Sequence, residues 1–148
     1  MEDLRALPVR LSIDIPAPVG KVWREAADLG SHVEWMADAV SIRFPGRRSG
    51  RGTRMVVKTR LGPFRVTDLL EVTAWEPRRR IGVVHRGAVS GQGDFLLEPL
   101  GRRATRFTWQ EVLRFPWWLG GPLGALFARP ILRRIWRGNL EQFRRRFL

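Results

Sequence analysis

The chain has 148 residues, which is enough for one domain with a sizeable hydrophobic core. Its apolar content of 44% argues against intrinsic disorder, and the absence of cysteine excludes disulfides, thiolate metal sites and cysteine nucleophiles. The two histidines, His32 and His85, lack further ligands at a close spacing, so we expect no metal site and no cofactor. No apolar run has the length of a transmembrane helix, and the N-terminal residues lack the apolar segment of a signal peptide, so we expect a cytoplasmic protein.

The formal net charge of +13 would attract anionic partners such as nucleic acid or a membrane surface. Of the 27 basic residues only Lys21 and Lys58 are lysines, a bias that a GC-rich genome also produces. The arginines are scattered singly at alternate strand positions, as on a solvated face, and no nucleic-acid-binding motif is present. We therefore expect a basic, solvated surface with at most weak electrostatic binding to anionic membranes and no specific binding to nucleic acid. The sequence does not indicate an oligomeric state.

The first expected element is a strand over residues 9–15, where apolar and polar residues alternate. Pro18 is then well placed near the start of a helix, and apolar residues recur at helical spacing as far as Asp28. Gly30 is expected to end this helix.

A second, short helix is expected next, because Ser31 and Glu34 have the spacing of a capping box. This helix carries His32, Trp35 and Met36. We expect His32 to lie at the surface.

From residue 40 onward the apolar period changes to two, which is typical of strands. Turn signals such as Pro45-Gly46 and Gly62-Pro63 divide the stretch. Six strands are therefore expected, over residues 40–44, 55–61, 64–72, 81–86, 95–98 and 105–113.

The last element is a long helix from Ala128 onward. Its apolar residues stand at positions 128, 132, 135, 136, 143 and 147, which form one stripe on a helix of about twenty residues. Arg133 and Arg137 fall on the opposite side. We expect Trp136 and Phe143 to be buried against the sheet.

The order of elements is one strand, two short helices, six strands and a long helix. Clustered strands followed by a terminal helix indicate an antiparallel sheet with a helix on one face, which is an α+β fold. No internal repeat or linker divides the chain, so residues 1–148 are expected to form a single domain.

Five segments, in this order and spacing, resemble the START-like (SRPBCC) superfamily, and in particular its bacterial polyketide cyclase/dehydrase-like branch. They are residues 13–18 (IDIPAP), 34–36 (EWM), 71–79 (EVTAWEPRR), 105–109 (TRFTW) and 121–124 (GPLG). The resemblance implies a helix-grip fold, in which a curved antiparallel sheet wraps around the C-terminal helix. It also implies a cavity between the two, often for an apolar ligand, in a family that includes lipid and sterol carriers and aromatic polyketide cyclases.

Strand parity places Asp68, His85 and Glu111 on the face of the sheet that turns toward the helix. These three are the candidate catalytic residues, since a carboxylate and an imidazole could act as acid and base on a cyclic substrate. Alternatively they orient a ligand, or the carboxylates pair with arginines or lie in water at strand ends. The expected ligand-binding residues are Trp35, Met55, Val57, Val66, Phe95, Trp109, Glu111, Ile131 and Ile135.

A second apolar cluster, over residues 115–127, contains Trp117 and Trp118. Glycines are expected to make it flexible, and Pro130 would break or kink a helix passing through it. We expect the two tryptophans to cap the cavity and pack on the sheet. The alternative is an apolar lip flanked by arginines and suited to a membrane interface.

The sequence therefore predicts a protein that binds a hydrophobic or aromatic small molecule, lipid-like or polyketide-like, and that is not an enzyme. The first alternative is a cyclase or dehydratase that uses Glu111, Asp68 or His85. The second is a peripheral protein of the membrane surface that uses the tryptophan-rich segment and the basic helix.

Overall fold

The structure, a computed structural model, describes residues 7–148. Within this range a seven-stranded sheet is accompanied by two α-helices and two 3-10 helices. The strands are β1 (Leu7–Ile15), β2 (Ala39–Arg43), β3 (Arg54–Leu61), β4 (Phe64–Glu76), β5 (Arg80–Arg86), β6 (Ser90–Pro99) and β7 (Thr105–Arg114). The α-helices are α1 (Val19–Ala27) and α2 (Gly121–Arg145), and the 3-10 helices are η1 (Leu29–Glu34) and η2 (Trp117–Leu119).

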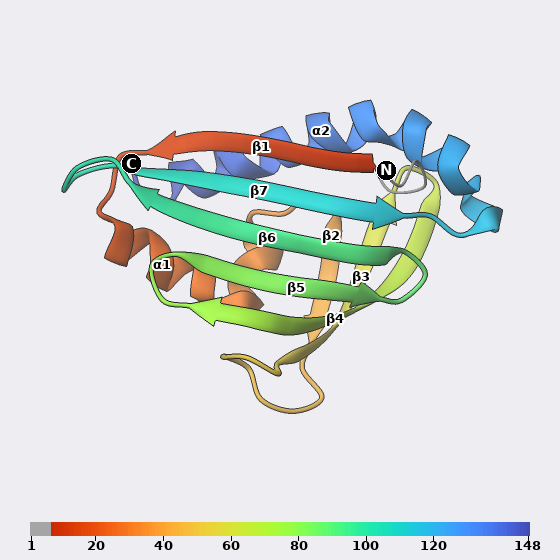
Figure 1. The fold of residues 1–148 in the computed structure, drawn as a ribbon, viewed down its shortest axis with the longest axis horizontal. Coiled ribbons are helices and arrows are strands. Elements are labelled where there is room, and N and C mark those ends of the chain that lie inside the picture. Colours follow the sequence, from red (N-terminus) through yellow and green to blue (C-terminus); the bar gives the residue numbers. More distant parts are fainter. Residues whose placement is uncertain (1–6) are drawn as a thin grey trace, which may run out of the picture.

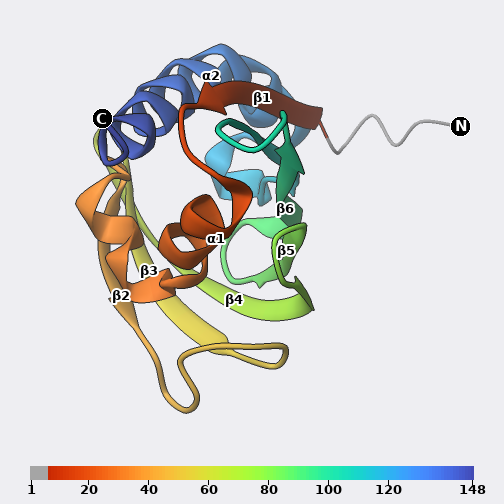
Figure 2. The ribbon, with the colours of Figure 1, turned by 90° about the vertical axis from the view of Figure 1, so that its left-hand side faces the viewer.

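The strands pair antiparallel throughout, in the order β1-β7-β6-β5-β4-β3-β2. The sheet is strongly curled, and α2 lies along its open side next to β1 (Figures 1 and 2). Helices α1 and η1 lie at one end of the curl, whereas η2 and the start of α2 lie at the other end (Figure 1). The predicted helix-grip fold, a curved antiparallel sheet around a long C-terminal helix, is confirmed.

An aromatic core joins α2 to the inner face of the sheet. Trp136 stacks on Trp109 of β7 with ring centroids 4.7 Å apart, and Phe143 lies 4.9 Å from Phe107. Trp35, which follows η1, packs 4.7 Å from Phe143. Aromatic pairs of this kind contribute about 0.5–1.5 kcal/mol beyond the burial of their surface. The predicted burial of Trp136 and Phe143 is confirmed, since both lie in the core.

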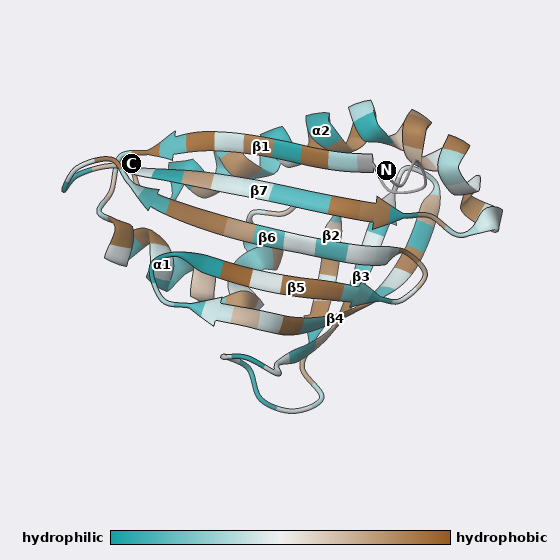
Figure 3. Ribbon diagram, viewed as in Figure 1, coloured by the Kyte–Doolittle hydropathy of each residue, from teal (hydrophilic) through white to brown (hydrophobic). Residues whose placement is uncertain are grey.

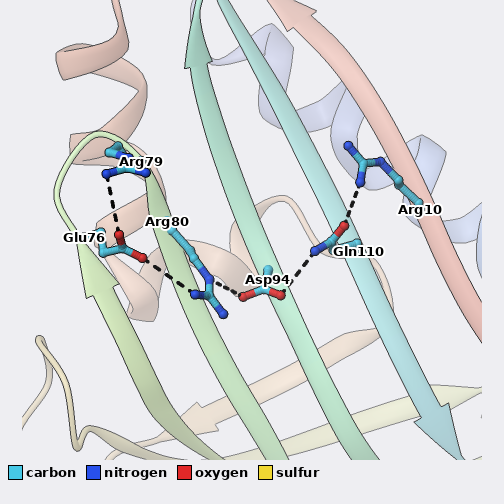
Figure 4. Close-up of polar contacts among 6 residues, drawn as sticks. All are labelled: Arg10, Glu76, Arg79, Arg80, Asp94 and Gln110. Atoms are coloured by element: carbon cyan, nitrogen blue, oxygen red, sulfur yellow. Dashed lines mark hydrogen bonds and ion pairs between the residues drawn. The ribbon is translucent and has the colours of Figure 1, made fainter.

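The outer face of the sheet is polar. Figure 4 shows a chain of side-chain contacts that crosses β4, β5, β6, β7 and β1, formed by Glu76, Arg79, Arg80, Asp94, Gln110 and Arg10. Its shortest contact is the 2.7 Å bond from Arg80 Nε to Asp94 Oδ1. Exposed ion pairs contribute only about 0.2–1 kcal/mol each, so this network orders the surface more than it stabilises the fold.

The helices after β1 differ from their predicted form. Helix α1 ends at Ala27, and Gly30 lies inside η1 instead of ending α1. The prediction that Ser31 and Glu34 form a capping box is wrong. Ser31 Oγ instead donates a 2.7 Å bond to the carbonyl of Asp28, and no side chain caps the start of η1. Ser31 lies inside η1, whose N-cap residue is Asp28.

Helix α2 is longer than predicted, because it begins at Gly121 and not near Ala128. Pro130 lies inside it without interrupting it, at the expense of one amide donor to the preceding turn. Gly120, with φ 90°, supplies the left-handed turn that starts the helix. A Cβ on Gly124 would lie 1.8 Å from the carbonyl oxygen of Leu119, so this glycine permits a close approach of backbone.

Trp117 and Trp118 do not cap the cavity or pack on the sheet, and that prediction is wrong. Their side chains are 87% and 50% exposed. Phe115 and Leu119, on either side of them, make the contacts with the core instead. The single turn of η2 is closed by bonds from the amides of Leu119 and Gly121 to the carbonyl of Pro116, which leaves the two tryptophans outside.

None of the helices in residues 7–148 is both long and apolar enough to span a bilayer.

Candidate functional site

A cavity of about 150 Å³ lies between the curled sheet and α2. An apolar cavity of roughly this volume accepts a molecule such as benzene, so the space suits about one aromatic ring without rearrangement. It extends from Leu29 and His32 of η1 to Val89 and Phe115 at the opposite end of the sheet. Leu132 and Trp136 of α2 form its lid.

Six of the nine predicted ligand-binding residues line this cavity: Met55, Val57, Val66, Phe95, Trp109 and Glu111. Their alternation along the strands placed them on the inner face, and the curl of the sheet brings them together.

The other three predicted residues, Trp35, Ile131 and Ile135, are not part of the cavity wall. Trp35 is buried in the aromatic core against Phe143, and Ile135 packs at the edge of that core. Ile131 is 61% exposed. Because successive helical residues are turned by about 100°, a helix that presents Leu132 to the cavity directs Ile131 away from it.

The three candidate catalytic residues are brought into contact. His85 of β5 lies with Nδ1 2.6 Å from Asp68 Oδ2 of β4 and with Nε2 3.4 Å from Glu111 Oε1 of β7. Glu111 Oε1 also accepts a 3.1 Å bond from Trp109 Nε1. His85 and Glu111 are each 8% exposed, so the group forms a charged wall in a largely apolar cavity.

Gly93 of β6 allows Glu111 to reach His85 across an intervening strand. It pairs with Val83 on one side and with Glu111 on the other. A Cβ at this position would lie 2.8 Å from Glu111 Cγ, closer than side chains tolerate. The missing side chain therefore provides the space that the Glu111 carboxylate occupies.

Burial alone would lower the pKa of His85, but the charge and close polar contact of Glu111 and the hydrogen bond and charge of Asp68 more than offset it and raise the pKa to about 10. At neutral pH His85 is therefore an imidazolium between two carboxyl groups. Its Nε2 forms an ion pair with Glu111 Oε1 at 3.4 Å, but the geometry of this long contact is not that of a hydrogen bond, and no other residue in 7–148 accepts one from it. A buried charged donor is thus available to a ligand in the cavity.

A fourth polar group, Asp38, was not predicted. It lines the cavity, where Asp38 Oδ1 accepts a 2.8 Å bond from Asn139 Nδ2 and Asp38 Oδ2 accepts a 3.3 Å bond from Trp136 Nε1. Burial raises the pKa of this carboxyl, although the bonds from Asn139 and Trp136 act in the opposite direction. Asn139 could have signalled the contact, since it is a polar residue inside the apolar stripe of α2.

His32 is not at the surface, and that prediction is wrong. It is buried between the rings of Trp35 and Phe95, and its Nε2 lies 2.8 Å from the carbonyl oxygen of Ala26. Burial lowers the pKa of His32 to about 4, so the ring is neutral near pH 7 and donates from Nε2. This bond holds η1 against the end of α1.

The contact of Asp68, His85 and Glu111 does not make a metal site. No group of three or more His, Asp or Glu residues in the part of the chain that the structure describes has an arrangement that could hold a metal ion.

The comparisons with solved structures agree with this architecture. A crystal structure of a protein from Thermus thermophilus matches with a TM-score of 0.80 and 22% identity, over 95% of this chain and 97% of that chain. The Zhui aromatase/cyclase from Streptomyces sp. R1128 matches with a TM-score of 0.72 and 15% identity, over 94% and 92%. A START superfamily protein from Mycobacterium smegmatis matches with a TM-score of 0.66 and 12% identity, over 91% and 90%. At these identities the likeness shows the fold alone.

A comparison with curated protein sequences found no match. The model of one protein family, described as polyketide cyclase / dehydrase and lipid transport, matches residues 7–147. This match includes every strand and helix of the structure and the cavity residues Asp38, Asp68, His85 and Glu111. The chain therefore belongs to the polyketide cyclase / dehydrase and lipid transport family.

Proposed function

We propose that the protein binds an apolar or aromatic small molecule that carries a hydrogen-bond-accepting oxygen. The observation that carries this proposal is the buried Nε2 of His85, a charged donor without a hydrogen-bond partner in the described chain. The ion pair with Glu111 leaves this donor without a well-formed hydrogen bond, and a ligand oxygen could supply one. The apolar walls would hold the rest of the molecule, so that affinity comes from burial and orientation from His85.

The aromatic lining favours a flat ligand. Trp109 and Trp136 stack on each other beside the charged wall, and Phe95 stands 5.4 Å from Trp109. A carbonyl or phenol oxygen directed at His85 would leave the ring of the ligand against these side chains. The cavity volume of about 150 Å³ is compatible with one such ring.

Acetophenone and ethylbenzene provide a matched pair of probes, since they share a carbon skeleton and differ in one acceptor oxygen. A hydrogen bond to a charged donor contributes about 1.5–3 kcal/mol, so acetophenone should bind roughly tenfold or more tightly in an NMR titration. His85→Leu should abolish this preference while ethylbenzene still binds. Equal affinities of the unmodified protein for the two probes, or no binding of either, would refute the proposal. Native mass spectrometry of the purified protein would identify a co-purifying ligand.

A second function is acid–base chemistry of the cyclase or dehydratase type, and the position of Glu111 beside His85 favours it. With a ketone oxygen on His85 Nε2, the carboxylate of Glu111 could take a proton from the adjacent carbon. The C–H bond would break, the proton would move to Glu111 and the electron pair would pass to the oxygen, where the imidazolium stabilises it.

Hydrogen–deuterium exchange of the acetophenone methyl group, followed by NMR in D₂O, tests this second function. The unmodified protein should accelerate exchange, and Glu111→Gln should bind acetophenone without accelerating it. Exchange at the uncatalysed rate in the presence of saturating protein would exclude this chemistry. Ligand binding would then remain as the proposed function.

A further inference from the structure

One side of the apolar segment at the start of α2 remains outside the core. The η2–α2 patch, as we call it, consists of six exposed apolar residues: Trp117, Trp118, Leu123, Leu126, Phe127 and Ile131. Trp117, Phe127 and Leu123 are 87%, 73% and 66% exposed. They lie at the end of the molecule where η2 leads into α2, and Figure 3 shows apolar turns on this free end of the helix. Monomeric soluble domains seldom leave so many large apolar side chains together in water without a function for them.

The first half of α2 is apolar on two sides, and only one of them has a partner in the described chain. Ala125 and Leu132, seven residues apart, face inward and are buried. Leu123, Phe127 and Ile131 follow one another at intervals of four on another side, which no described element covers. A helix that is apolar all round needs a partner on every side, so the outer side is built for contact with an apolar phase.

The charges around the patch specify the kind of partner. Between Glu111 and Glu141 the chain contains five arginines and no acidic residue. Two of them, Arg133 and Arg134, follow directly after Ile131 and Leu132 on α2. A second copy of this chain, which carries a net charge of +13, would bring like charges together across a symmetric contact. An anionic lipid bilayer offers both an apolar interior and a complementary charge.

We propose that the η2–α2 patch is a docking surface for anionic lipid bilayers. Trp117 and Trp118 insert at the level of the headgroups, where the amphipathic indole ring is most stable. Leu123 and Phe127 extend the inserted surface along α2, and the neighbouring arginines bind the headgroups.

The position of the patch connects docking with the cavity. Phe115 lines the cavity two residues before Trp117, and Leu132 lines it one residue after Ile131. Docking therefore places one end of the cavity at the membrane surface. If the cavity binds an apolar ligand, as proposed above, that ligand could exchange with the bilayer without crossing bulk water.

Vesicle co-sedimentation tests docking without reference to any ligand. Vesicles of phosphatidylglycerol and phosphatidylcholine in equal parts are compared with vesicles of phosphatidylcholine alone, at low salt and at about 0.15 M salt, where exposed charges are screened beyond about 8 Å. The unmodified protein should bind the anionic vesicles at both salt concentrations. Trp117→Ala combined with Trp118→Ala should weaken binding at the higher salt at least tenfold, and so should Leu123→Ser combined with Phe127→Ser.

Val40→Ser combined with Leu148→Ser is the matched control, because these side chains are 56% and 76% exposed but lie outside the patch. This variant should bind as the unmodified protein does. Quenching of tryptophan fluorescence by brominated lipid should occur in the unmodified protein and disappear in the Trp117 and Trp118 double variant. Binding of the unmodified protein that is lost at the higher salt, or that persists in both patch variants, would overturn the proposal. So would light scattering that shows a dimer which the patch variants convert to a monomer.

Discussion

The cavity buries charged groups, whereas the η2–α2 patch exposes large apolar ones. Inside the cavity His85 and Glu111 are each 8% exposed, while Trp117 in the patch is 87% exposed. Burying ions costs free energy unless they are paired, and exposing indole rings forgoes the free energy of burying them. The ions of the cavity are paired with one another, whereas the indole ring of Trp117 remains in water. Under the two proposals above, a small ligand would complete the cavity and a bilayer would complete the patch.

The largest expected effect is on the free energy of unfolding when one tryptophan from the core and one from the patch are each replaced by alanine. Trp136→Ala removes a buried ring stacked on Trp109 and should lower the free energy of unfolding by about 3–5 kcal/mol. Trp117→Ala should change it by no more than about 0.5 kcal/mol, because an exposed ring contributes little to the fold. Urea unfolding followed by circular dichroism measures both values. A large loss in Trp117→Ala would mean that the patch belongs to the core.

The next effect is the dependence of stability on pH, and it reports on the buried ions. The pKa of His85 is about 10 in the folded protein and about 6.5 in an unfolded chain. The charged His85 therefore contributes fully to the free energy of unfolding below about pH 6.5. This contribution is lost as the pH rises toward 10, with a slope of up to about 1.4 kcal/mol per pH unit. The chain has no tyrosine or cysteine and only two lysines, so few other groups titrate in this range.

Urea unfolding of the unmodified protein and of His85→Leu, at intervals from pH 6 to pH 10, checks this dependence. The free energy of unfolding of His85→Leu should lack the decline. A parallel decline in both proteins would show that His85 is not charged in the cavity.

A smaller effect is expected at the polar contact between α2 and the cavity. Asn139→Ala removes the donor to Asp38 Oδ1 and the acceptor of the 2.9 Å bond from the amide of Ala37. Leaving buried polar groups unpaired should lower the free energy of unfolding by about 1–3 kcal/mol. Arg137→Ala, on the exposed side of the same helix, serves as the control and should change it by no more than about 0.5 kcal/mol. Similar values for the two variants would show that Asp38 finds other partners.

Local sequence was sufficient to assign the seven strands and their inner faces, except for residues 90–94, which begin β6 and were not predicted as strand. Alternation along the chain established which residues share a face, so Asp68, His85 and Glu111 could be assigned to the inside from their positions alone. The stripe that includes Trp136 and Phe143 likewise identified which side of α2 is buried. Both inferences depend only on the geometry of one strand or one helix, which local sequence encodes.

Which groups meet was determined by the tertiary structure and could not be inferred locally. Asp38 lies in a connection whose apolar residues show no regular period. It reaches Asn139 only because the segment between η1 and β2 lies against α2, where the amide of Ala37 also donates to Asn139. His32 is buried because the rings of Trp35 and Phe95 surround it, a contact between segments about sixty residues apart. The apolar pattern of residues 115–131 is as strong as that of the buried stripe, yet its outer side has no partner within the described chain. Periodicity states which side of a helix is apolar, but whether that side is covered depends on the path of every other element.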